Sequence, residues 1–114
     1  MYTDAEIIYK NVKKLEEGVY RVQGKRRTWE GLTDIQKLRF ALIAAGEVLK
    51  TVKISDVVKA AGIKGMKTNE IIIAAGNAKK ELPDYRLVIM REDPIENYSL
   101  LQNGVFTCCE FDDQ

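Results

Sequence analysis

Residues 54–82 read ISDVVKAAGIKGMKTNEIIIAAGNAKKEL, and the predicted fold follows from this stretch. It predicts a short helix, a turn with two glycines and a longer helix. Ser55 is placed to cap the first helix, because its hydroxyl accepts from free backbone N–H groups. Gly62 is placed to end that helix in a left-handed conformation. Thr68 is placed to cap the second helix, whose apolar residues recur three and four positions apart.

Two helices joined by a short turn form a helix-turn-helix, whose second helix commonly enters the major groove of DNA. On the side of helix 68–82 away from its apolar positions, asparagines could pair with adenine edges and an isoleucine could contact a thymine methyl. Lysines beside the start of this helix, and the helix N-terminus itself, suit phosphate. The residues predicted to contact DNA here are Lys64, Lys67, Thr68, Asn69, Ile73, Asn77 and Lys80.

A second basic segment lies upstream, where Lys25, Arg26 and Arg27 precede Trp29. One interpretation is an arm that contacts phosphates, anchored to the protein by its tryptophan. The other is a solvent-exposed turn whose tryptophan packs in the core. Both interpretations stay open on the sequence, and the three cations join the candidate DNA-contacting residues.

The net charge of +1 is unevenly distributed. Residues 1–67 carry fourteen Lys and Arg against eight Asp and Glu, whereas residues 68–114 carry four against nine. The basic part contains the first helix of the motif, its turn and the upstream basic segment. This asymmetry predicts a modest phosphate-binding surface on an almost neutral protein.

The remaining chain predicts further helices and strands. Thr33 and Gln36 form a capping box at the start of a long apolar helix, because each side chain can satisfy the other's backbone N–H. The expected elements outside the motif are a helix over 3–17, a strand over 19–22, a helix over 33–50, an extended link over 51–54, a hairpin of 85–91 and 98–102, and a last strand over 105–111.

This order, from helix 33–50 to the hairpin that ends at residue 102, resembles that of winged helix-turn-helix domains. The resemblance rests on element order rather than on a diagnostic motif. It implies an α+β fold with a three-helix core and a C-terminal β-hairpin, here with an extra N-terminal helix. The expected divisions are a dimerisation or DNA-contact extension over 1–32, the winged domain over 33–102, and a strand with an acidic tail over 103–114.

The resemblance implies a sequence-specific protein that binds double-stranded DNA, most simply a cytoplasmic homodimer that regulates transcription by inserting helix 68–82 in the major groove. The alternatives are a winged-helix protein-interaction module and a plasmid or phage partition or replication adaptor. The hairpin tip carries Glu92, Asp93 and Glu96, which phosphate would repel and a protein partner could bind.

Other functions are disfavoured by composition. The chain has no His, which removes the commonest general base and metal ligand, and neither an enzyme nor a cofactor is expected. Residues 61–68 resemble a phosphate-binding loop but have Met66 in place of the glycine before the lysine. Cys108 and Cys109 are adjacent, so no disulfide framework or structural zinc site is expected. No apolar run approaches the ~20 residues needed to cross a bilayer, so no membrane span is expected. The N-terminus lacks the basic and apolar regions of a signal peptide, which predicts an intracellular protein.

Overall fold

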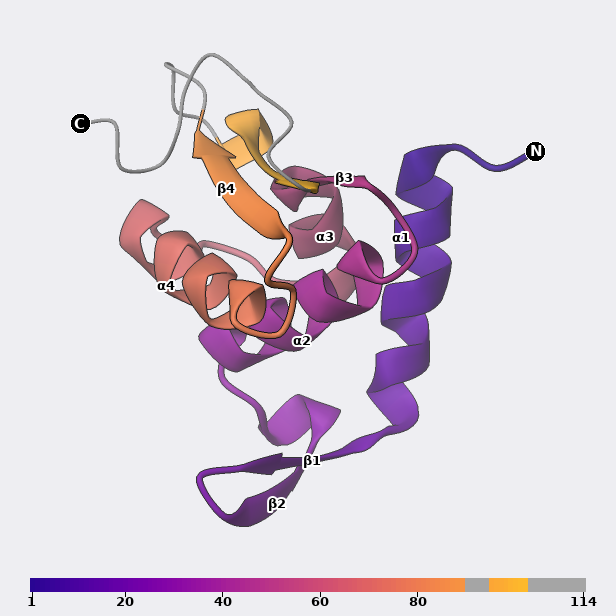
Figure 1. Cartoon of the computed structure of the whole chain (residues 1–114). Helices are drawn as coiled ribbons and strands as arrows, with labels where there is room; N and C mark the ends of the chain where they lie inside the picture. Colours follow the sequence, from indigo (N-terminus) through magenta and orange to yellow (C-terminus); the bar gives the residue numbers. More distant parts are fainter. Residues whose placement is uncertain (90–94, 103–114) are drawn as a thin grey trace.

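The computed structural model describes residues 1–89 and 95–102, and in this part the chain forms four α-helices and two small antiparallel sheets (Figure 1). The α+β class is therefore as predicted. The α-helices are α1 (Asp4–Lys13), α2 (Asp34–Gly46), α3 (Ile54–Ala61) and α4 (Thr68–Lys79). The strands are β1 (Val19–Val22), β2 (Lys25–Thr28), β3 (Thr51–Lys53), β4 (Tyr85–Ile89) and β5 (Tyr98–Gln102). Short 3₁₀ segments are η1 (Lys14–Glu17), η2 (Trp29–Gly31) and η3 (Ile95–Asn97).

The larger sheet has the strand order β3-β5-β4, with every neighbouring pair antiparallel. Leu100 of β5 lies opposite Val52 on one side and Leu87 on the other. The sequence predicts a short extended link or strand over residues 51–54. The structure has an edge strand over Thr51–Lys53, in which fully buried Val52 lies opposite Leu100 of β5.

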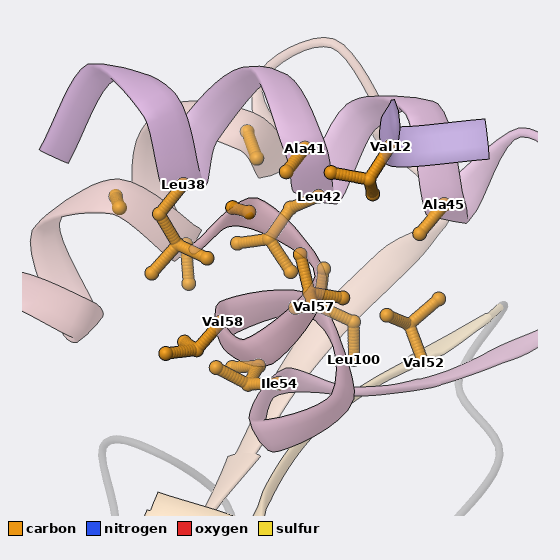
Figure 2. Close-up of a cluster of buried hydrophobic side chains, with 14 of the residues drawn as sticks. Val12, Leu38, Ala41, Leu42, Ala45, Val52, Ile54, Val57, Val58 and Leu100 are labelled. Carbon is orange, nitrogen blue, oxygen red and sulfur yellow. The ribbon is translucent and has the colours of Figure 1, made fainter. Parts of the chain in front are cut away.

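A continuous apolar core joins the helices to this sheet. Figure 2 shows side chains from α1, α2, α3, β3 and β5 converging on it, with Leu42 and Val57 near its centre. Full burial of a large aliphatic side chain contributes about 1.5–3 kcal/mol. Ile8 and Val12 of α1 and Leu38 of α2 are all buried in this core. The N-terminal helix therefore packs on the same core as α3 and α4.

The start of α2 has the predicted capping box. The Gln36 backbone N–H donates to Thr33 Oγ1 at 3.2 Å, and the Thr33 N–H donates to Gln36 Oε1 at 3.0 Å. Thr3 and Glu6 form a second box at the start of α1. The Thr3 backbone N–H stabilises the carboxylate of Glu6 and lowers its pKa.

Two predicted caps are wrong. Helix α3 begins at Ile54, one residue before the proposed cap Ser55, because fully buried Ile54 fixes the first turn against the core. Helix α4 is capped at Lys67 rather than Thr68. The Lys67 backbone N–H donates to Glu70 Oε1 at 2.9 Å, which makes Thr68 the first helical residue.

Two helices end earlier than predicted. Helix α2 ends at Gly46 instead of residue 50, and α4 ends at Lys79 instead of residue 82. The Tyr85 hydroxyl shares its one hydrogen between the carbonyl oxygens of Gly46, at 2.7 Å, and of Leu49, so β4 supplies a hydrogen-bond partner at the end of α2. Burial raises the pKa of Tyr85.

The turn between α3 and α4 contains the predicted glycines. Gly62 and Gly65 have φ values of +73°, which side chains with a Cβ rarely adopt. Ile63 is buried between them, as the apolar residue that follows a helix end. This turn sets α4 at one flank of the molecule, with α1 at the opposite flank (Figure 1).

Candidate nucleic-acid interface

Helix α4 has one buried face and one exposed face. Its buried residues are Ile71, Ala74, Ala75 and Ala78, which pack on the core. The outer face of α4, defined by Asn69, Ile73, Gly76 and Lys80, is exposed to solvent. The structure therefore brings three of the predicted contact residues onto one uncovered surface. Ile73 is 49% exposed on it, a large apolar side chain with no covering element among the described residues.

Asn77 does not belong to this exposed face, because it is half-buried. It lies in a groove of about 320 Å³ at the C-terminal end of α4. The β1–β2 turn and α2 provide the other walls of this groove. Its lining residues are Val22, Gln23, Gln36, Arg39, Asn77, Lys80 and Glu81.

Arg39 adds a guanidinium to this region that the sequence prediction missed. Its Nη1 lies 3.5 Å from Glu81 Oε2, and the two side chains are 24% and 58% exposed. The helix-turn-helix pattern could not reveal it, since Arg39 belongs to α2 and reaches the groove only through the packing of α2 on α4. The region beside Asn77 and Lys80 thus contains an arginine, although α4 itself has none.

The predicted phosphate contacts at the start of α4 are exposed. Lys64 and Lys67 lie in the α3–α4 turn, and Thr68 is the first residue of the helix. In residues 1–89 and 95–102, neither lysine has an ion-pair partner. Their charges are therefore available at the start of α4, where the Lys67 backbone N–H donates to Glu70 Oε1.

The upstream basic segment is a strand rather than an arm. Lys25, Arg26 and Arg27 belong to β2 and pair with β1 in a hairpin. Trp29 is only 1% exposed, so the tryptophan anchors this hairpin as one interpretation predicts and packs in the core as the other predicts. Its ring lies 5.9 Å from that of Tyr20, and the Lys37 Nζ lies 6.0 Å from its centroid.

The register divides these cations between the two faces of the hairpin. Arg27 lies opposite Tyr20 and Lys25 lies opposite Val22, on the face that contacts the core. Arg26 lies opposite Arg21, on the outer face. Arg21 is a further exposed cation that sequence reasoning missed. Strand alternation from the predicted strand 19–22 was the available signal for it.

Several predictions fall outside the described residues. Glu92 and Asp93 lie in the segment 90–94, and the strand, acidic tail and two cysteines predicted in 103–114 lie beyond residue 102. Glu96 is in η3, but its side chain is outside the description too.

Two further findings concern the described ranges. Residues 1–89 and 95–102 contain no group of three or more His, Cys, Asp or Glu side chains arranged to hold a metal ion. None of the helices in these ranges has the length and apolar character required to cross a bilayer. Comparison with protein-family models, with curated proteins and with solved structures finds no match to this chain.

Proposed function

We propose that the protein is a winged helix-turn-helix protein that binds double-stranded DNA, with the outer face of α4 in the major groove. The single observation that carries the proposal is the exposed outer face, where Asn69, Ile73 and Lys80 lie with no covering element among the described residues. The element order α2-β3-α3-α4-β4-β5 and the strand order β3-β5-β4 support the winged-helix assignment.

The chemistry of this face suits base edges flanked by phosphate. An asparagine amide can donate to and accept from adenine, and an isoleucine can contact a thymine methyl. Lys64 and Lys67 lie before the helix, and Lys80 lies at its end, so cations are available at both ends of the reading surface. The nearby Glu70 carboxylate accepts from the Lys67 backbone N–H. In this proposal the protein regulates transcription in the cytoplasm.

Gly76 would allow a partner to lie close to the backbone at the middle of α4. A Cβ added there would meet no described atom within 4 Å, so the protein's own packing does not require glycine. Glycine in a helix interior costs about 1 kcal/mol relative to alanine. A partner that lies directly against the helix backbone gives this glycine a role, as a duplex in the groove would.

A homodimer completes the proposal. Helix α1 lies on the flank opposite α4 (Figure 1), and Tyr9 of this helix and Tyr2 just before it are exposed. Two copies joined through this helix would leave both α4 outer faces uncovered. Such a dimer would read two half-sites with the symmetry of the protein.

Titration of the protein with genomic duplex fragments at several salt concentrations tests DNA binding. If about five phosphates are neutralised, log K is expected to fall against log salt with a slope near −4 to −5. Fluorescence anisotropy of a labelled fragment measures this slope. Absence of binding at low salt, or a flat slope, would contradict the proposal, and an interaction module would give that result.

Gly76→Ala is expected to change stability and DNA affinity in opposite directions. The folded state should gain up to about 1 kcal/mol, because alanine is the better helix former and its Cβ meets open space. DNA affinity should fall, because the new methyl group holds the duplex away from the helix. Urea unfolding and anisotropy measure the two effects. Unchanged affinity in the stabilised variant would show that no ligand approaches the middle of α4.

A further inference from the structure

We infer that the β1–β2 hairpin is a phosphate-binding ribbon that contacts the sugar–phosphate backbone of the same duplex beside α4. This inference rests on the proposed function and assigns the flanking contact to one element. The segment 18–29 contains four cations and no Asp or Glu. The cations are Arg21, Lys25, Arg26 and Arg27.

The register of the hairpin places two like charges directly opposite each other. Arg21 pairs with Arg26 across the strands, and both are exposed on the outer face. Like charges in this arrangement destabilise a sheet, where opposite charges would contribute roughly 0.2–1 kcal/mol. Within residues 1–89 and 95–102, no carboxylate forms an ion pair with either arginine. A bound phosphate would relieve the repulsion, since guanidinium groups bind phosphate with paired hydrogen bonds.

The opposite face of the hairpin holds this pair in place. Val22 is buried, and the Tyr20 hydroxyl donates to the Leu15 carbonyl oxygen. The Tyr20 ring also lies 4.8 Å from that of Phe40 on α2. The two strands are closed by a two-residue turn, in which Gln23 and Gly24 have φ values of +53° and +79°. A tight turn with both residues at positive φ matches the natural twist of a hairpin, so the arginines are presented by an ordered ribbon.

The hairpin lies next to the proposed DNA-binding helix. Val22 and Gln23 form one wall of the groove that Asn77 and Lys80 line from α4. The turn of the hairpin therefore lies beside Lys80 at the C-terminal end of α4. The connection between β4 and β5 is less suited to this task, because its sequence contains Glu92, Asp93 and Glu96 with the single cation Arg91.

The double variant Arg21→Gln/Arg26→Gln tests the inference. The hairpin should fold at least as well as in the wild type, because the repulsive pair is removed. The salt slope of duplex binding should become shallower by about 2, and affinity should fall equally for all duplex sequences. Hydroxyl-radical footprinting should lose protection at sugars flanking the α4 site while the central protection remains.

Lys50→Gln/Lys53→Gln is the matched control, because it removes the same charge from exposed positions beside and on the edge strand β3, outside the helix proposed for dimerisation. Its salt slope should equal that of the wild type. A wild-type slope and footprint in the hairpin variant would overturn the inference and leave the proposed function standing. Absence of duplex binding by the wild-type protein would overturn the proposed function. A hairpin variant that loses affinity for single-stranded RNA or anionic vesicles, but not for duplex DNA, would also overturn the inference.

Discussion

Trp29→Ala is expected to lower the free energy of unfolding by about 3–5 kcal/mol, the usual cost of truncating a large buried aromatic side chain. Trp29 is 1% exposed and joins the end of the β1–β2 hairpin to the core. Its loss leaves a cavity beside Tyr20, whose ring packs at 60° to the indole. The basic hairpin would then lose its main anchor. Urea denaturation followed by circular dichroism measures the loss.

Two further variants test whether the loss of stability is specific to the Trp29 indole. Trp29→Phe should lose less stability, because the phenyl ring fills part of the same space. Val19→Ala, in the same hairpin but 58% exposed, should change stability by no more than about 0.5 kcal/mol. A Trp29→Ala loss as small as that of Val19→Ala would mean that the hairpin does not depend on the indole.

Replacing Lys64, Lys67 and Lys80 together by alanine is expected to weaken binding to every duplex sequence. Each lysine that contacts phosphate contributes about one unit of salt slope, so the slope should become shallower by about 3. Lys64 and Lys67 precede α4 and Lys80 follows it, which places the three charges around the proposed reading surface. Salt-dependent anisotropy on specific and random duplexes measures both affinity and its sequence dependence.

Replacement of Lys14, Lys50 and Lys53 by alanine is the control, because all three are exposed and lie on η1, just before β3 and on the edge strand β3, outside α1. This variant has the same net charge as the α4 variant. Equal loss in the two variants would show that only overall charge matters. A protein-interaction module would bind its partner normally in both, and charge reversal at Glu92, Asp93 and Glu96 would be expected to disturb that partner instead.

Local signals predicted much of the fold. The Thr33–Gln36 capping box and the left-handed Gly62 depend on residues a few positions apart, and both are present as expected. The predicted cap at Ser55 was wrong for a nonlocal reason, and the predicted cap at Thr68 was wrong for a local one. Burial of Ile54 in the tertiary core moves the start of α3, whereas Glu70 reaches back to the Lys67 N–H and moves the cap of α4.

The candidate site was predictable only where one helix provides it. The exposure of Asn69, Ile73 and Lys80 follows from the helical period of α4. The groove around Asn77 does not, because Arg39 comes from α2 and Gln23 from a separate hairpin. The pairing of Arg21 with Arg26 in that hairpin could not be predicted, because it depends on the strand register. The turn sets this register, and basic composition alone does not specify the turn.

The position of β5 between β3 and β4 has a consequence for protein synthesis. Both outer strands are synthesised before residues 98–102, so until then the nascent chain lacks the strand that pairs with each of them. The β1–β2 hairpin needs only neighbouring residues and can form while translation continues. The larger sheet cannot close before residues 98–102 have been made. A chain cut before residue 98 would therefore have two unpaired strand edges, a form prone to aggregation.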